Sequence, residues 1–231
     1  MLRFYNVLSG SPTLTPASSK RNRFGYLRAN TKCEPYITAS TLGWIGHLPF
    51  SLQLRWERGL RILWRLSTAD DFQEFDFLFA TDLKLEAPTL RPFDSVPVVA
   101  IAPEEGVVQF WTGLVGFGEN DAAIRVRSIP NYPTRFQYLV YDGVIEVGWW
   151  HGPIVFPIRL LRSDVTITIS PDRPLYYVEP IPSLTALRAA LHQSPIDDVR
   201  SLGPDELELM RAEIAPTGRA NSYAARSRSR R

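Results

Sequence analysis

The chain has 231 residues, 45% of them apolar and 22% charged, and a formal net charge of +2. This composition supplies a hydrophobic core and excludes a chain that is disordered throughout. No apolar run approaches the ~18 residues of a membrane-spanning helix, the first residues lack the pattern of a secretory signal, and a single cysteine, Cys33, excludes an intramolecular disulfide. We therefore expect a cytoplasmic protein that has no membrane contact.

The first half of the chain is dominated by a two-residue apolar alternation, which is typical of β-strands. Phe75, Phe77 and Phe79 would form an aromatic ridge on one strand face. Arg58 and Gly59 are suited to the turn of a hairpin. The strands predicted here are residues 4–8, 36–39, 51–57, 60–66 and 72–79.

From Gly106 onward the predicted strands follow one another at a spacing typical of a sandwich or barrel. Asp142 and Gly143 predict a tight turn between two of them. The glycine-containing segment 113–118 is not followed by the helix that a phosphate-binding loop needs, so it predicts a bulged or bent connection. The strands are residues 107–111, 123–126, 136–141, 144–147, 154–160, 165–169 and 175–178.

Helical periodicity occurs only near the end of the chain. Ser183 is a fair N-cap for a helix over residues 184–192, and a second helix is predicted from Pro204 to about Ile214. The fold class is therefore mainly β: an antiparallel β-barrel or sandwich over residues 1–182, with a C-terminal helical pair over 183–215 packed on it.

The remaining residues, 216–231, are expected to be a disordered tail. Its last fifteen residues, which we call the arginine-rich segment (residues 217–231), contain five arginines and no acidic residue. Without them 21 basic side chains face 24 acidic ones, so residues 1–216 carry a net charge of about −3. Weak contact with nucleic acid and simple solubilisation are the two alternatives for this tail.

One candidate site surrounds Glu146, which follows a tight turn and precedes two tryptophans. A carboxylate near indoles is partly desolvated, so Glu146 could act as a general base with His151 as its partner. The alternative is an exposed strand carboxylate paired with Arg159 or Arg162. The ligand-binding candidates are Arg127, Asn131, Trp149, Trp150 and Arg159.

Metal or cofactor chemistry has little support in the sequence. The three histidines, His47, His151 and His192, form no close pair of ligands, and only a distant set of His47, His151 and Glu146 could be imagined. Cys33 has no base near it in sequence and is expected to be structural. We therefore predict no metal and no cofactor.

Two blocks of the sequence resemble a bacterial and phage family known only as a domain of unknown function. The first is KCEPYITASTLGW, residues 32–44, followed by Trp56. The second runs from Arg127 through Pro130-Asn131-Tyr132 to GVIE, residues 143–146, and the tryptophan pair of GVIEVGWW. The resemblance spans about residues 4 to 182 and implies a common fold without an established activity.

A weaker similarity reaches the dUTPase and dCTP-deaminase barrels. Residues 143–152 resemble their Gly-x-Ile-Asp-x-x-Tyr-x-Gly block with one residue more, and residues 170–175 resemble their Pro-Gly-Asp-Arg strand entry. In that family the acid positions a water or a sugar hydroxyl and the aromatic side chain stacks on the sugar. The serine-rich phosphate loop and the glycine-rich clamp of that family are absent here.

These observations favour a non-catalytic binding or assembly module, with possible phage association, that forms a homo-oligomer through sheet edges and exposed aromatic side chains. The first alternative is an enzyme acting on a small molecule or nucleotide, with a pocket around Glu146 and Trp149. The second is nucleic-acid contact through the arginine-rich segment.

Overall fold

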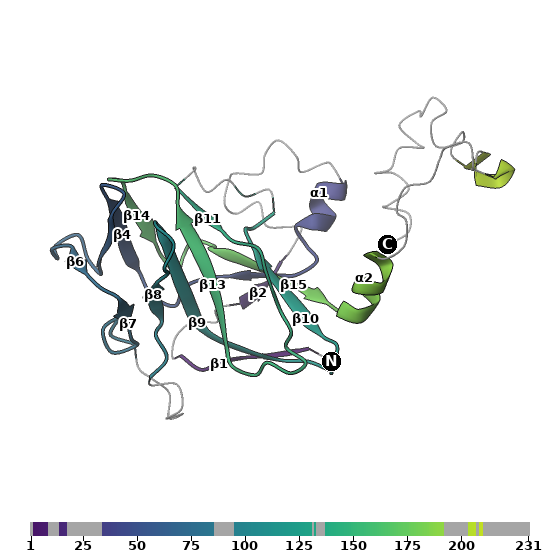
Figure 1. Ribbon diagram of the computed structural model, residues 1–231, viewed down its shortest axis with the longest axis horizontal. Coiled ribbons are helices and arrows are strands. Elements are labelled where there is room, and N and C mark those ends of the chain that lie inside the picture. Colours follow the sequence, from purple (N-terminus) through teal and green to yellow (C-terminus); the bar gives the residue numbers. More distant parts are fainter. Residues whose placement is uncertain are drawn as a thin grey trace.

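The structure is a computed structural model that describes residues 2–8, 14–17, 34–85, 95–130, 132, 137–191, 203–206 and 208–209. Its described part consists mainly of antiparallel strands in three sheets, with two short helices (Figure 1). The prediction of a mainly β, antiparallel fold is confirmed.

Sheet A has six strands in the order β11-β13-β9-β8-β7, and β1 also pairs with β9. The central strand β9 is eleven residues long and contacts three partners, β1, β8 and β13. The strands are β1 (Arg3–Asn6), β7 (Phe77–Leu78), β8 (Val99–Ile101), β9 (Val107–Phe117), β11 (Tyr138–Val140) and β13 (Pro153–Leu160).

Sheets B and C are smaller. Sheet B has the order β12-β10-β15-β3-β2, with β2 (Leu14–Pro16), β3 (Trp44–Gly46), β10 (Ala123–Arg127), β12 (Gly143–Ile145) and β15 (Tyr176–Ile181). Sheet C has the order β14-β4-β5-β6, with β4 (Leu52–Glu57), β5 (Arg61–Arg65), β6 (Gln73–Glu74) and β14 (Thr166–Ile169).

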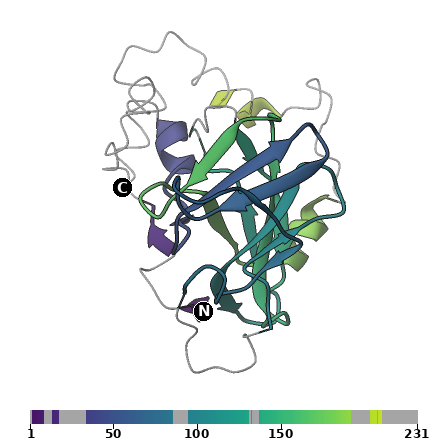
Figure 2. The same cartoon turned by 90° about the vertical axis from the view of Figure 1, so that its left-hand side faces the viewer.

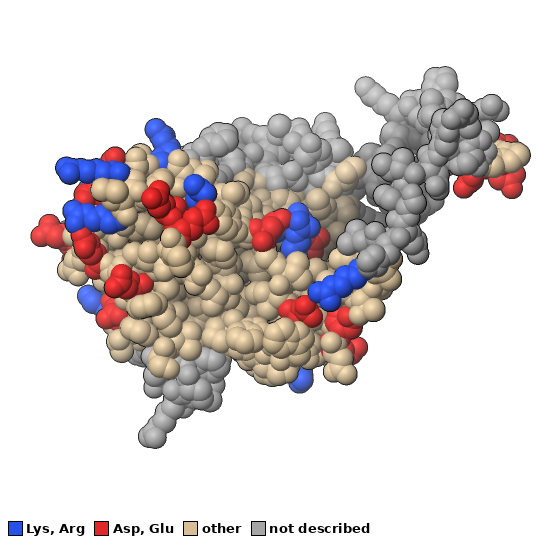
Figure 3. Space-filling view, viewed as in Figure 1, with Lys and Arg blue, Asp and Glu red and all other residues tan. Residues whose placement is uncertain are grey.

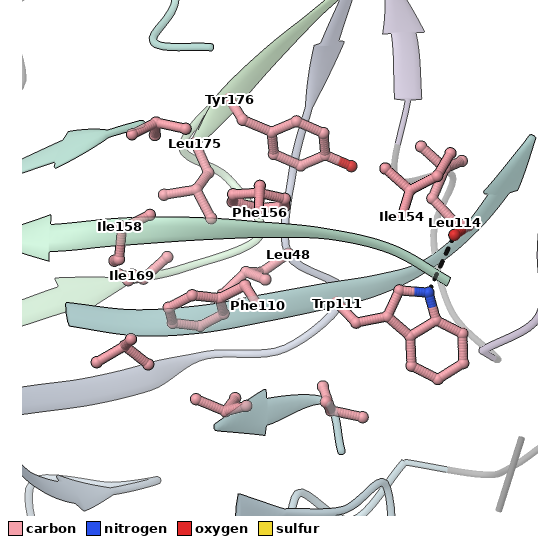
Figure 4. Packing of buried hydrophobic residues seen from close by; sticks show 14 of the residues in the cluster. Leu48, Phe110, Trp111, Leu114, Ile154, Phe156, Ile158, Ile169, Leu175 and Tyr176 are labelled. Atoms are coloured by element: carbon pink, nitrogen blue, oxygen red, sulfur yellow. Dashed lines mark hydrogen bonds between the residues drawn. The ribbon is translucent and has the colours of Figure 1, made fainter. Parts of the chain in front are cut away.

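The three sheets share one hydrophobic core. Leu54 of sheet C, Ile158 of sheet A and Val178 of sheet B belong to a single cluster of buried side chains. Figure 4 shows Phe110, Phe156 and Tyr176 among the strands, with the phenyl rings of Phe110 and Phe156 stacked 6.3 Å apart. The alternating apolar residues of the predicted strands supply these side chains, which is why most of those strands form where expected.

The described strands do not close into a barrel, so that part of the prediction is wrong for the residues described. Figure 2 shows the blue strands β4 and β5 in front of the teal and green strands. No pairing among the described strands joins sheet C to sheet A or sheet B. Alternation indicates which side chains face the core, but it contains no information on which strand edges meet.

Two predicted strands are also wrong. Residues 36–39 belong to helix α1 (Glu34–Ala39), because Pro35 fits the first turn of a helix and four residues are too few to define a period. Residues 72–79 form two short strands, β6 and β7, in different sheets. The predicted ridge is therefore divided, and Phe77 lies exposed on β7.

Of the two turns predicted at Arg58-Gly59 and at Asp142-Gly143, only the first joins a hairpin. The hairpin of β4 and β5 is confirmed, with positive φ at Arg58 (52°) and Gly59 (73°). The turn at Asp142 and Gly143 does not join a hairpin, since β11 pairs with β13 in sheet A and β12 pairs with β10 in sheet B. Residues 113–117 continue β9 and are not a separate connection, but the predicted bulge is confirmed: Gly113 has a φ of 81°, and the register with β13 shifts between the pairs Val155–Trp111 and Pro153–Val115.

The predicted helix after Ser183 is confirmed as α2 (Leu184–Leu191). Pro204–Glu206, Glu208 and Leu209 are helical, and the rest of the second predicted helix lies outside the described residues, as does the arginine-rich segment. The domain boundaries at 182 and 215 therefore remain predictions. Neither α1 nor α2 has the length or the apolar content to traverse a bilayer, and no other described helix does.

Candidate functional site

The turn that follows β12 is fixed against the β9–β10 connection. The backbone N–H groups of Trp149 and Trp150 donate to the Glu146 carbonyl at 3.2 and 2.9 Å. Gly148 donates to the Ala122 carbonyl at 3.0 Å and lies so close to the next segment that a Cβ there would be 2.5 Å from the Glu119 carbonyl oxygen. A side chain at position 148 would therefore separate the two segments.

Both carboxylate oxygens of Glu146 accept a hydrogen bond. Oε2 accepts from the indole N–H of Trp149 at 3.1 Å, and Oε1 accepts from the Arg188 guanidinium at 3.2 Å. The cation is thus Arg188 on α2, and not Arg159 or Arg162 as the sequence suggested. The carboxylate is tied to an indole and a guanidinium, which is an arrangement that holds side chains in place.

The two tryptophans lie on the surface and not in the core. The exposed fractions are 64% for Trp149 and 43% for Trp150, and the rings meet edge to face with centroids 6.2 Å apart. The indole N–H of Trp150 donates to the Pro153 carbonyl at 3.1 Å. Since both indole N–H groups bond within the protein, each ring has a defined orientation while its apolar surface faces solvent.

Among the described residues the hydrogen-bond partners of the Glu146 carboxylate are Trp149 and Arg188, so His151 does not take the predicted role of its partner in base catalysis. Its imidazole stacks on Phe117 at 4.8 Å with an interplanar angle of 12°. The Tyr5 ring also packs edge to face on the Phe117 ring, with their centroids 5.6 Å apart. These contacts form two ring groups, Tyr5–Phe117–His151 and Trp149–Trp150, which adjoin in sequence at Trp150 and His151; together we call them the aromatic surface.

Helix α2 is attached beside this surface through Asp121. The Asp121 carboxylate accepts from the Ser183 hydroxyl, the Thr185 N–H (3.0 Å) and the Thr185 hydroxyl (2.9 Å). The hydrogen bond from Ser183, followed by those from Thr185, lowers the pKa of Asp121 below its ordinary value. Ser183 itself accepts from the Ala186 N–H at 3.0 Å, which confirms it as the N-cap.

Arg127 belongs to a different group of side chains. It pairs with Glu179 at 3.1 Å, and its guanidinium carbon lies 5.7 Å from the centre of the Tyr177 ring. Arg127 Nε is buried and has no hydrogen-bond partner among the described residues. Burial raises the pKa of Tyr177 to about 12. Within the described part of the chain, no hydrogen bond or ion pair joins this group to Glu146.

Arg159 belongs to a third group. It donates to Glu104 at 2.7 Å and to the Tyr141 hydroxyl at 3.2 Å, and that hydroxyl donates to Glu104 at 3.0 Å. The structure thus brings Glu146, Trp149, Trp150 and His151 into one region and leaves Arg127 and Arg159 elsewhere. Asn131 lies outside the described residues.

A surface groove of about 410 Å³ was not found from the sequence. It is lined by residues 60–62, 74–76 and 101–106, which come from the β4–β5 turn, from β5 and β6, and from the β8–β9 connection. Its carboxylates are Glu74, Asp76, Glu104 and Glu105. Because the two pairs are about 30 residues apart in the sequence, only the sheet pairing reveals that they share a groove.

Metal binding receives no geometric support within the described ranges, where no three His, Cys, Asp or Glu side chains lie together suitably for an ion. Comparison with known protein families found no family model that matches the chain, and no curated protein is similar to it. The two resemblances noted in the sequence therefore stay predictions.

Proposed function

We propose that the protein is a binding and assembly module whose aromatic surface contacts a second copy of the chain. The observation that carries this proposal is the orientation of Trp149. Its ring is mostly exposed, yet its N–H is held by Glu146, which is in turn bound by Arg188. An exposed aromatic ring that is already ordered loses little conformational entropy when it is buried by a partner.

The neighbouring strand supports a second copy as the partner. β12 lies at the edge of sheet B, so one side of its backbone has no strand partner in that sheet, and Val144 on β12 is exposed. Unprotected edges favour the addition of a strand from another chain. We infer that two copies meet around a twofold axis at β12, with the tryptophans next to it. A sandwich-like stacking of the sheets, inferred from their common core, would leave this end accessible.

The same contacts support binding rather than catalysis at Glu146. A general base needs a carboxylate oxygen that can reach a substrate proton. Here both oxygens accept hydrogen bonds from the protein, and His151 is stacked on Phe117. These contacts favour a positioning role for Glu146.

Sedimentation velocity of the purified chain tests the proposal. The double variant Trp149→Ala/Trp150→Ala should shift the protein from oligomer toward monomer, because aromatic anchors account for much of an interface's affinity. Phe77→Ala, which removes another exposed aromatic side chain on β7, is the matched control and should leave the distribution unchanged. A wild-type chain that is monomeric at all concentrations, or an oligomer that only Phe77→Ala disrupts, would contradict the proposal.

Two substitutions at Glu146 separate positioning from catalysis. Glu146→Gln keeps a carbonyl oxygen that can accept from Trp149 and should largely preserve assembly, whereas Glu146→Ala should weaken it. The enzyme alternative makes a different prediction for Glu146→Gln: the wild-type chain has an activity toward a nucleotide or small molecule, and this substitution abolishes it.

A further inference from the structure

The groove is lined by both apolar and mainly acidic side chains. Leu60, Phe75 and Ile101 are among the apolar residues that line it. Four carboxylates and one cation, Arg61, also line it, so its lining has a net charge of −3. Figure 3 shows basic and acidic side chains intermixed over the end of the molecule where β4, β6 and β7 lie, and few charged side chains over the face around β9 and β13.

Two of the four carboxylates are already bound to arginines. Arg61 pairs with Glu74, and Arg159 donates to Glu104 at 2.7 Å. The other two, Asp76 and Glu105, are exposed and make no salt bridge or side-chain hydrogen bond within the described part of the chain. Planar guanidinium groups match carboxylates well, so the carboxylates of Asp76 and Glu105 are suited to accept hydrogen bonds from further arginine side chains.

We propose that this groove binds the arginine-rich segment (residues 217–231) of the same chain. The segment has five arginines and no acid, opposite in sign to the groove and to residues 1–216. The methylene stems of arginine pack on apolar surface while the charged end stays in water, and Leu60, Phe75 and Ile101 supply apolar surface along the groove. The contact does not depend on the aromatic surface.

The length of chain permits this contact within one molecule. The 25 residues between α2 and the segment can span up to about 85 Å when extended. A domain of this size has a radius of gyration of about 16 Å, so the segment can reach any part of the surface. Attachment to the same chain raises its effective concentration at the groove to the millimolar range, approximately.

Binding in the groove would also regulate the segment. Arginines that contact Asp76 and Glu105 are not available to the phosphates of a nucleic acid. The groove would therefore act as an internal competitor that weakens nonspecific nucleic-acid binding.

The test uses the full chain in which the five arginines of residues 217–231 are replaced by alanine, which we call the five-alanine variant. A fluorescent peptide with the sequence of residues 217–231 is titrated into it, and fluorescence anisotropy gives the affinity. The peptide should bind, and its affinity should fall with added salt, because the contacts are exposed ion pairs. Adding Asp76→Asn/Glu105→Gln should weaken binding about tenfold.

The matched control is Asp205→Asn/Glu208→Gln, which removes the same two charges from exposed positions outside the groove. It should leave the affinity unchanged. The wild-type chain, whose own segment occupies the groove, should bind the labelled peptide about tenfold more weakly than the five-alanine variant. Circular dichroism checks folding, and the single variants Asp76→Asn and Glu105→Gln carry the test if the double variant does not fold.

Three results would overturn the proposal. The peptide could fail to bind the five-alanine variant. The control variant could weaken binding as much as the groove variant, which would indicate a general charge effect. The wild-type chain and the five-alanine variant could bind the peptide equally, which would mean that the segment does not occupy the groove. None of these results would affect the test of the aromatic surface, which measures oligomeric state.

Discussion

Thr112 is the one buried residue of the described core that is neither aliphatic nor aromatic. Its hydroxyl is 2.8 Å from the Tyr176 hydroxyl, and both residues are fully buried. A buried hydroxyl without a partner is costly, so the two residues satisfy each other. This pair joins β9 of sheet A to β15 of sheet B through the middle of the core.

Thr112→Val should lower the free energy of unfolding by about 1–3 kcal/mol, because it leaves the Tyr176 hydroxyl buried without a partner. Chemical denaturation measures this change. Tyr176→Phe in the Thr112→Val background should recover part of the loss, since it removes the orphaned hydroxyl. If the double variant is less stable than Thr112→Val by the full cost of Tyr176→Phe alone, the two hydroxyls do not act as a pair.

The individual partners of the candidate residues could be predicted only where they are close in sequence. Ser183 was found as the N-cap because capping is local. Asp121, which bonds to the same turn, lies 62 residues away from Ser183, and Arg188 lies 42 residues away from Glu146. No local pattern predicts these pairs, so the sequence indicated Glu146 and the tryptophans but gave Glu146 the wrong cation.

Asp121 fixes the start of α2 to the β9–β10 connection, so Asp121→Ala should loosen the helix. Ser183 and Thr185 would lose a shared acceptor, and hydrogen exchange of the first turn of α2 should become faster. Asp142→Ala removes a carboxylate that bonds to Arg125 and serves as the control. Unchanged exchange in α2 after Asp121→Ala would contradict this account.

Strand β3 passes so close to β15 that a side chain is excluded from it at one position. A Cβ at Gly46 would lie 2.1 Å from the Tyr176 ring, whereas one at Gly143 would meet nothing within 4 Å. Gly46→Ala should therefore destabilise the protein by about 1–3 kcal/mol through overpacking. Gly143→Ala should change its stability little. Thermal denaturation of the two variants tests the difference, and equal effects would refute it.

Strands with long, regular alternation were predicted best, since burial of one face requires that pattern. β4 and β13 are examples: Leu52 and Leu54 of β4 are buried, as are Ile154 and Phe156 of β13. Two- and three-residue elements such as β6, β7 and β12 have too few residues to show a period. The sheet to which each of them belongs depends on pairing with strands that are distant in sequence, and no local sequence pattern predicts that pairing.

High pH should reveal how much of the fold depends on neutral tyrosines. Burial raises the pKa of Tyr138 and Tyr177 to about 12, and it raises that of Tyr176 as well. Unfolded tyrosine ionises near its ordinary pKa of 10. A raised folded pKa means that this contribution to stability is complete below pH 10 and is lost as pH rises toward 12.

Tyrosinate absorbance and circular dichroism, followed together over that pH range, measure the effect. The buried tyrosines should ionise in the same transition in which the β-sheet signal is lost. Tyr177→Phe should reduce the dependence of unfolding free energy on pH, because one of the groups is then removed. Ionisation of all tyrosines near pH 10 with an intact sheet would show that these side chains reach solvent readily.

Sheet B also determines when the chain can fold during its synthesis. β3 pairs with β2 on one side and with β15 on the other, and β10 pairs with β15 as well. β15 ends at Ile181, so a ribosome must add more than 130 residues after Gly46 before β3 can be paired on both sides. Until then the nascent chain exposes unpaired strand backbone, a state in which incompletely folded chains are prone to aggregate.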